Sequence, residues 1–398
     1  MKGHFLIVFM VLMSTIAMLA MMLWQCMHRR GRKLLMFCSG IAVTVAATGI
    51  LGLYGQNFSY LAGGILKGTL FYGSLASLIW MFMFLLALPF LLVGAIASLG
   101  ELIAERFMSA PVEANHAVIS RRKFLRRTAT VIPAAALAAS SVGIIGGERS
   151  LDTTYHSLQY SNLPEYLEGY RIGQLSDLHM GLFFSPERLE ESIDALVVAK
   201  ADRLVITGDL IDELSLLPQC EQILQAAAEK FPDGIDFIYG NHEYYRGLAQ
   251  ITAMLERTPV RILRNSNYEA GAGTQPFYMA GVDYSFARDD ALFDEQREAY
   301  TQQALAGIPD GAFVVLLAHH SQFIDEGLRH AIPLTLTGHT HGGQFWLFGQ
   351  LHEFGFKYWR GMFSQGEARG YVHRGTGHWL PFRLGCSREA AVFELHKG

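Results

Sequence analysis

The stretch Leu204-Val205-Ile206-Thr207-Gly208-Asp209-Leu210-Ile211-Asp212 passes from an apolar run into a turn and two carboxylates. Short apolar runs that end in turn residues predict buried strands. The same change occurs at four other places, where apolar runs at 170–175, 237–239, 313–317 and 334–336 lead into Asp177 and His179, Asn241 and His242, His319, and His339 and His341. Since α/β sheets place their sites beyond the strand ends, these polar side chains are expected to gather there.

The residue types in these blocks suit a pair of divalent metal ions. Carboxylate and amide oxygens are hard donors, and imidazole nitrogens suit Mn, Fe, Zn, Ni or Co. The blocks contain no cysteine, which argues against a structural zinc site. Two ions roughly 3.5–4 Å apart can activate a water molecule and hold a phosphoryl group. The residue types therefore predict a site for two divalent ions that could act on a phosphoryl group.

Five blocks in a fixed order, D-x-H, G-D-x-x-D, G-N-H-E, a histidine and G-H-x-H, resemble the calcineurin-like metallophosphoesterases. The ending G-H-T-H-G-G-Q is similar to the bacterial branch with transmembrane or twin-arginine N-termini. The resemblance extends over residues 155–395 and includes softer matches at 263–265, 281–283 and 381–383. It implies an α/β fold, a sandwich of two sheets flanked by helices and preceded by transmembrane helices.

The resemblance also implies a role for each polar residue. Asp177, His179 and His341 would bind the first metal ion, and Asn241, His319 and His339 the second. Asp209 would bridge both ions and would count as catalytic for that reason. His242 would stay off the metals, near the leaving-group oxygen, as a general acid or charge stabiliser. Metal-activated water would attack phosphorus in line.

Three neighbouring residues leave alternatives open. The family often has Asn-Pro after the fourth-block histidine, whereas His320-Ser321 follows here. His319 is chosen as the ligand because it is in the family register, and His320 is then a pocket residue or a polar neighbour. Asp212 is expected to support the site or to begin a helix, with direct metal contact as the alternative. Glu243 is expected to orient His242, or else to face solvent.

Four long apolar runs occupy the first third of the chain, at residues 5–27, 34–54, 70–99 and 128–146. Such runs are long enough to span a bilayer, although the fourth is shorter and rich in alanine. Buried helices of a soluble protein are the alternative for each run alone. Four runs together predict about four transmembrane helices in a membrane region at 1–150, followed by a catalytic domain at 151–398.

Basic residues predict the orientation of these spans. They gather at 28–33 and 101–127, which the positive-inside rule places in the cytoplasm. Residues 151–398 would then lie outside, on the periplasmic or extracytoplasmic side of a bacterial inner membrane. The stretch Ser120-Arg121-Arg122-Lys123-Phe124-Leu125-Arg126 also resembles a twin-arginine export signal, with a plain basic flank as the alternative. Cleavage after Ala136-Leu137-Ala138 stays open.

Length and charge fit this division. The 398 residues leave about 250 for one soluble α/β domain. The net charge of −4 and the lack of a basic run in the catalytic part argue against a nucleic-acid partner. Cys220 and Cys386 could pair outside the cell membrane. Helices are expected from Ser185-Pro186-Glu187 onward and over 217–231 and 292–305.

The sequence therefore predicts a membrane-anchored, metal-dependent phosphohydrolase with two divalent ions of unknown identity. The bilayer and a phosphate-containing substrate, such as a phospholipid or a lipid pyrophosphate, are the expected partners. A UDP-diacylglucosamine-type pyrophosphatase of envelope lipid metabolism is one alternative, although the expected topology counts against it. A non-catalytic sensor on the same scaffold and a transporter with an accessory domain are the others. The transporter lacks a visible pathway, because the spans carry few ionisable residues.

Overall fold

The computed structural model describes single helical positions between residues 79 and 103, residues 131–147 except 133–134, and residues 151–398 except 182, 272–274, 345–355 and 379–381. The chain divides into two compact units, Met1–Gly146 and Gly147–Gly398. The first two expected spans lie outside the described residues, and the third and fourth lie partly outside them. Among the residues that are described, no helix is both long enough and apolar enough to cross a bilayer.

The unit Gly147–Gly398 is built around two six-stranded sheets. In the first sheet the strand order is β1 (Leu151–Tyr160), β12 (Arg388–Lys397), β2 (Arg171–Leu175), β3 (Arg203–Ile206), β4 (Ile235–Phe237) and β5 (Arg261–Ile262). In the second it is β10 (Gly361–Gln365), β11 (Ala368–Val372), β9 (Leu334–Thr337), β8 (Phe313–Leu317), β7 (Phe277–Gly281) and β6 (Ser266–Glu269). Strands β2 to β5 pair in parallel, as do β7, β8, β9 and β11. Both sheets therefore send several carboxyl strand ends in one direction.

The two sheets pack face to face, because their strands carry apolar residues on both sides. In β8, Phe313, Val315 and Leu317 belong to the core between the sheets. Val314 and Leu316 belong to a second core on the outer face. This alternation has the period of two residues that a strand imposes, and a strand buried on both faces is apolar throughout. The sandwich layers therefore follow from the apolar runs themselves.

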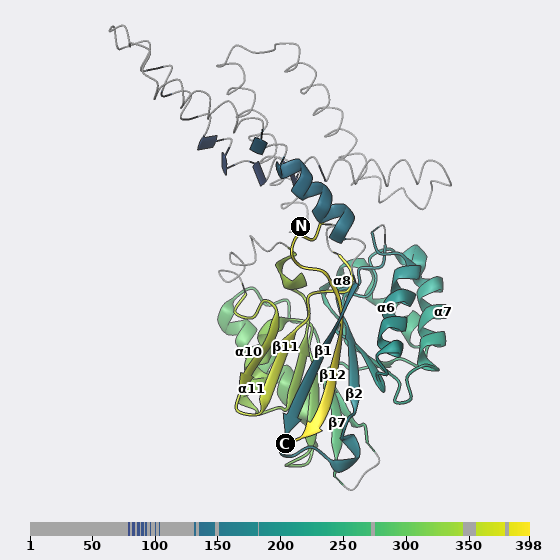
Figure 1. The fold of residues 1–398 in the computed structure, drawn as a ribbon. Coiled ribbons are helices and arrows are strands. Elements are labelled where there is room, and N and C mark those ends of the chain that lie inside the picture. Colours follow the sequence, from purple (N-terminus) through teal and green to yellow (C-terminus); the bar gives the residue numbers. More distant parts are fainter. Residues whose placement is uncertain are drawn as a thin grey trace. The chain divides into compact units, whose positions relative to one another are not determined.

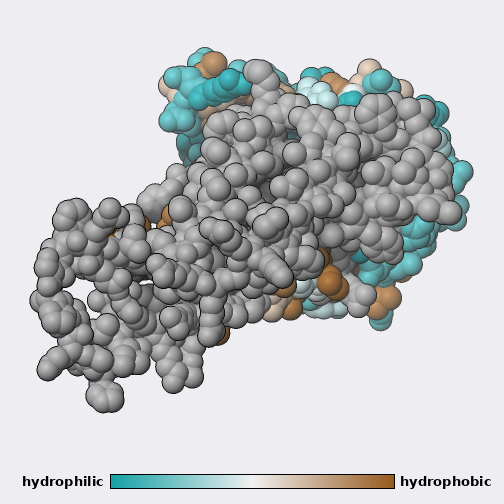
Figure 2. Space-filling view, turned by 90° about the horizontal axis from the view of Figure 1, so that it is seen from above, coloured by the Kyte–Doolittle hydropathy of each residue, from teal (hydrophilic) through white to brown (hydrophobic). Residues whose placement is uncertain are grey.

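Helices cover the outer faces of the sandwich (Figure 1). Helices α6 (Pro186–Val198), α7 (Leu217–Ala228) and α9 (Leu248–Leu255) bury apolar residues against the first sheet. Helix α10 (Asp290–Leu305) contributes to the core outside the second sheet, where α11 (Ile324–Arg329) also packs. The short helix α8 (Asn241–Arg246) follows β4. Where described residues are visible in Figure 2, most are hydrophilic, with hydrophobic residues scattered among them.

The expected elements are present, with shifted ends. Ser185 is the N-cap residue of α6, and Leu189, Ile193 and Leu196 are buried on one face as predicted. Helix α7 ends at Ala228 instead of Phe231, and β4 ends at Phe237 instead of Tyr239. No apolar run singled out in the sequence predicted β1, β12 or the hairpin β10–β11. The two-sheet sandwich flanked by helices is confirmed, whereas the transmembrane helices stay a prediction.

The two cysteines of this unit do not pair. Cys220 and Cys386 are both free and buried. Cys220 lies in the core between α7 and the first sheet, and burial raises the pKa of its thiol to about 12. Cys386 instead packs beside Gly342, with its Sγ 3.7 Å from the Gly342 carbonyl oxygen.

Candidate metal centre

All eight predicted site residues lie in loops that follow strands, three loops from the first sheet and two from the second. Asp177 and His179 follow β2, Asp209 follows β3, Asn241 and His242 begin α8 after β4, His319 follows β8, and His339 and His341 follow β9. Backbone hydrogen bonds join neighbouring loops, from Asp177 N–H to Gly208 O (3.1 Å) and from His179 N–H to Asp209 O (2.9 Å). The His339 N–H donates to the Asp177 carboxylate at 3.0 Å and so links the two sheets. The structure therefore brings the predicted residues together.

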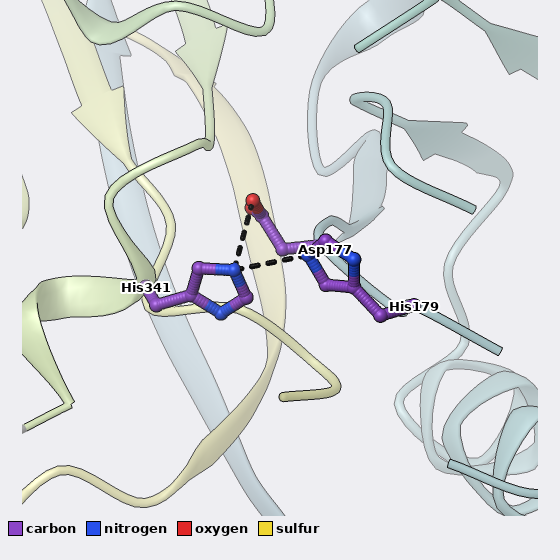
Figure 3. Close-up of side chains that lie close together, drawn as sticks. All are labelled: Asp177, His179 and His341. Carbon is purple, nitrogen blue, oxygen red and sulfur yellow. Dashed lines mark hydrogen bonds and ion pairs between the residues drawn. The ribbon is translucent and has the colours of Figure 1, made fainter. Parts of the chain in front are cut away.

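The first ligand group consists of Asp177, His179 and His341 (Figure 3). Nε2 of His341 lies 3.5 Å from Oδ1 of Asp177 and 3.1 Å from Nε2 of His179. All three side chains are buried. Burial and the neighbouring charges of His179 and Arg383 hold the pKa of His341 well below its usual range. A neutral imidazole is the form that binds a metal ion.

The second ligand group consists of Asp209, His319 and His339. Nε2 of His319 lies 3.3 Å from Oδ2 of Asp209 and 3.2 Å from Nδ1 of His339. The same Asp209 oxygen lies 3.6 Å from Nε2 of His179, which belongs to the first group. The side chain of Asp209 thus stands between the two groups.

Several observations show that the residues fit divalent cations. In each group two imidazole nitrogens lie 3.1–3.2 Å apart, so one cation could contact both of them. The buried Oδ1 of Asn241 has no hydrogen-bond partner, although buried polar atoms normally have one. Left-handed φ angles, which are strained for residues with side chains, occur at five of the predicted ligands, namely Asp177, His179, Asp209, His339 and His341. Such strain concentrates at functional sites, where the surrounding structure maintains it.

Glycines allow the loops to approach this closely. A Cβ atom on Gly240 would stand 2.2 Å from Oδ1 of Asp209. One on Gly338 would stand 2.0 Å from Oγ of Ser176 and 2.5 Å from Oδ2 of Asp177. Because any side chain would displace a predicted ligand, these two positions require glycine.

His242 lies beside both groups and is held by Asp212. Its Nδ1 lies 2.6 Å from Oδ1 of Asp212, which is also 3.3 Å from Nδ1 of His179. Burial disfavours the charged ring, but Asp209 and Asp212 outweigh it and raise the pKa of His242 to about 9. Distance alone would let His242 join His179 and Asp209 as a ligand. The charged ring that these two carboxylates favour is the form that can donate a proton.

The interpretation of Glu243 was wrong. Its buried carboxylate neither contacts His242 nor faces solvent. It accepts hydrogen bonds from the backbone N–H groups of Asp209 (3.0 Å), Leu210 (2.7 Å) and Gly240 (2.7 Å). Glu243 therefore fixes the loop that carries Asp209, and Asp212 is the residue that orients His242.

The adjacent histidines His319 and His320 face different surroundings. Nδ1 of His319 lies 2.7 Å from the carbonyl oxygen of Thr207, which leaves Nε2 turned toward Asp209. Nδ1 of His320 instead accepts from the Gln322 N–H at 3.3 Å, at the start of a 3-10 turn. The His320 ring contacts Phe293, with ring centroids 4.8 Å apart.

A segment near the C-terminus supports the first ligand loop, a role that the soft match at 381–383 did not assign. The Thr376 N–H donates to Ser176 O (2.7 Å), and the Gly377 N–H donates to Asp177 O (3.0 Å), so this segment holds the first ligand loop. The buried guanidinium of Arg383 binds the carbonyl oxygens of Gly375 (3.1 Å) and Gly377 (2.6 Å). Two glycines between histidines, in His373-Arg374-Gly375-Thr376-Gly377-His378, were the available signal.

A buried carboxylate supports the same segment. Glu389 accepts from the Tyr371 hydroxyl (2.8 Å), the Arg374 backbone N–H (2.9 Å) and the Arg374 side chain (3.1 Å). Burial opposes its ionisation, but His373 and Arg374 outweigh this effect and lower the pKa of Glu389 to about 2. Glu389 therefore joins β12 to the loop that supports Asp177.

This fold and these two ligand groups are those of a two-sheet, metal-dependent phosphoesterase. Comparison of the chain with known proteins agrees. Residues 170–343 match the calcineurin-like phosphoesterase family. An uncharacterized metallophosphoesterase of Bacillus subtilis is 30% identical over 290 residues, which cover 70% of this chain and 98% of the relative. The chain belongs to the calcineurin-like metallophosphoesterase family. It is a metal-dependent phosphoesterase, and its family uses a dinuclear centre of divalent ions.

Other relatives share the catalytic part. An uncharacterized metallophosphoesterase of Helicobacter pylori is 29% identical over 229 residues, covering 56% of this chain and 59% of the relative. The chain is also 28% identical over 326 residues to a protein of Danio rerio named transmembrane protein with metallophosphoesterase domain, covering 79% of this chain and 72% of that one. Their common feature is the phosphoesterase domain.

Proposed function

We propose that the chain is a membrane-anchored phosphohydrolase whose two metal ions share Asp209. Asp177, His179 and His341 would bind one ion, and Asn241, His319 and His339 would bind the other. The observation that carries this assignment is the position of Asp209, whose Oδ2 lies 3.6 Å from Nε2 of His179 and 3.3 Å from Nε2 of His319. A carboxylate between two groups of carboxylate, amide and imidazole donors can bridge two cations.

When bound, two divalent cations supply an activated water and charge stabilisation for the phosphoryl group. The chain provides the remaining chemistry. Because Asp212 engages Nδ1 of His242, Nε2 is the nitrogen left to face a substrate. His242 donates the proton from Nε2 to the leaving-group oxygen as the bond between phosphorus and that oxygen breaks. Asp212 holds the ring in place and favours its charged form before transfer.

Two observations support a membrane location for the enzyme. The first is the set of apolar runs at 5–27, 34–54, 70–99 and 128–146, with basic residues in the alternate connecting segments 28–33 and 101–127. The second is the similarity to relatives of Danio rerio and Bos taurus that are named transmembrane proteins. We propose an anchor in the bacterial inner membrane, an extracytoplasmic catalytic domain, and a phospholipid or lipid pyrophosphate as substrate.

The test is metal analysis with turnover on the full-length protein. Wild type is expected to bind two divalent ions per chain and to hydrolyse phosphate esters with Mn, Mg or Zn. Asp209→Asn is expected to lose most bound metal and nearly all activity, since both ions would lose a charged ligand. Asp236→Asn is a matched control, because Asp236 is equally buried but pairs with Arg203 at 2.8 Å. Full metal content and wild-type turnover in Asp209→Asn would overturn the assignment.

A further inference from the structure

Four aromatic side chains lie next to the candidate metal centre, and we refer to them as the aromatic rim. They are Tyr244, Tyr245, Tyr284 and Phe286. The Tyr245 ring lies 5.8 Å from the ring of His242 and 5.8 Å from that of Phe286, measured between centroids. Tyr284 continues the path, 4.7 Å from Phe286 and 5.6 Å from His339. The rim therefore extends from the proposed proton donor to the second ligand group.

The outer part of the rim is open to solvent. Tyr245 is 61% exposed and Phe286 is 45% exposed. Among the described residues, they are the one pair of exposed aromatic side chains whose rings contact each other. Exposed single apolar residues are common, whereas exposed apolar groups in contact beside a site indicate a binding surface.

The base of the rim is fixed by polar contacts that lie behind it. The Tyr244 hydroxyl donates to Asp283 Oδ1 at 2.6 Å, and Asp283 Oδ2 accepts from Arg264 at 2.7 Å. Asn265 accepts from the Asp283 N–H at 2.8 Å, and the Ser285 hydroxyl bonds to Gln296 at 2.7 Å. The loop that carries Tyr284 and Phe286 is therefore held in place before any ligand binds, which lowers the cost of binding.

We propose that the aromatic rim binds an apolar, ring-sized or larger hydrocarbon group on the leaving side of the substrate. This rests on the proposed function, in which His242 protonates the leaving oxygen. The organic group attached to that oxygen departs on the His242 side, and Tyr245 is the ring in contact with His242 there. The Tyr244 hydroxyl is already engaged by Asp283 and Arg264. Tyr244 and Phe286 thus offer hydrocarbon surface to a ligand.

The test compares phenyl phosphate with 4-biphenylyl phosphate on the full-length, metal-loaded protein. The two leaving groups are chemically alike and differ by one apolar ring. The wild-type protein is expected to favour the biphenylyl ester by about tenfold in kcat/KM, with the difference mainly in KM. In the double variant Tyr245→Ser and Phe286→Ser the preference in kcat/KM is expected to fall to within about twofold of unity. Tyr155→Ser is the matched control, because Tyr155 is 64% exposed and lies on β1.

A second pair of compounds tests whether the rim binds the leaving group or the group that stays on phosphorus. Methyl and 4-biphenylylmethyl esters of 4-nitrophenyl phosphate share one leaving group and differ only in the group that stays on phosphorus. The double variant is expected to leave that ratio unchanged. A preference lost in this second pair, or retained in the first, would overturn the inference.

Binding separates this inference from the proposed function. Phenylphosphonate and 4-biphenylylphosphonate cannot be hydrolysed, so calorimetry with them needs no turnover. If 4-biphenylylphosphonate bound more tightly in a way that depends on the rim, but no ester were hydrolysed, the proposed function would be wrong and the binding site would stand. If esters were hydrolysed but the two phosphonates bound equally, the proposed function would stand and the inference about the rim would be wrong.

Discussion

The carboxylate of Asp212 holds Nδ1 of His242 at 2.6 Å, the closest polar contact of that ring. The same oxygen lies 3.3 Å from Nδ1 of His179. One side chain thus orients a proposed proton donor and a proposed metal ligand. The two roles can be separated by substitution, because His242 and His179 belong to different loops.

We expect His242→Ala to keep both metal ions and to lose activity by roughly 10²–10⁴-fold, the usual effect of removing a positioned acid. The reason is that Nδ1 is engaged by Asp212, which leaves Nε2 free to meet a substrate. Metal analysis and kcat measured on the same preparation give the answer. Loss of an ion would instead identify His242 as a ligand.

We expect Asp212→Asn to lower activity by roughly 10–100-fold, less than His242→Ala, because the ring stays in place but loses a charged partner. In a His242→Ala background the same change should cost much less, since the main contact of Asp212 is already gone. Kinetics of the two single variants and the double variant form the cycle. Additive effects would show that Asp212 acts through another residue.

The adjacent histidines provide a matched pair. We expect His319→Ala to lose one ion, because Nε2 of His319 faces Asp209 at 3.3 Å. His320→Ala should keep both ions, since its Nδ1 accepts from the Gln322 N–H. Metal content per chain distinguishes them. The opposite result would shift the ligand by one position.

The lowered pKa of Glu389 predicts that its contribution to stability depends on pH. Its pKa is about 2 in the folded chain against an ordinary 4.5, so it stabilises the fold above pH 4.5 and loses that effect as pH falls toward 2. Glu389→Gln is expected to cost on the order of 3 kcal/mol at pH 7 and clearly less at pH 3. Thermal midpoints at both values of pH test this. Glu165→Gln, an exposed carboxylate 3.4 Å from Lys397, should change little at either pH. If Glu389→Gln lowered the stability equally at pH 7 and pH 3, the charge effect would be contradicted.

The proposed topology predicts the side of the C-terminus. Alkaline phosphatase fused there should be active, and a fluorescent reporter that folds only in the cytoplasm should be dark, because 28–33 and 101–127 carry the basic residues. The opposite pattern would reject this orientation and leave the metal centre unaffected. Changing Arg121 and Arg122 together to lysine then tests the export signal. Unchanged export would identify the pair as a basic flank.

Sequence patterns predicted the part of the fold that depends on local features. Apolar runs with polar ends specified β2, β3, β8 and β9, and Pro186 after Ser185 specified the start of α6. The end of β4 was missed, because Ile238 and Tyr239 are as apolar as the strand but lie beyond it. Burial in the core and membership of a strand give the same pattern.

The rest depended on contacts between distant parts of the chain. Strand β1 carries polar residues such as Asp152 and His156, so no apolar run identifies it, and the apolar run of β12 at 390–393 is short and flanked by two glutamates. Their pairing, from Leu151 with Arg388 to Tyr160 with Lys397, joins segments that a sequence pattern cannot relate. Glu243 was misinterpreted for the same reason, because its partners at Asp209 and Leu210 are on another loop.

The position of β12 has a consequence for how the protein is made. This last strand lies between β1 and β2, parallel to the first and antiparallel to the second. While the ribosome is still adding residues 388–397, β1 has no partner in its sheet and β2 has an open edge. The loop that supports Asp177 also waits for Glu389. The catalytic unit can therefore complete its fold, and its first ligand group, only after residues 388–397 have been made. Until then its unpaired strand edges need protection from other chains.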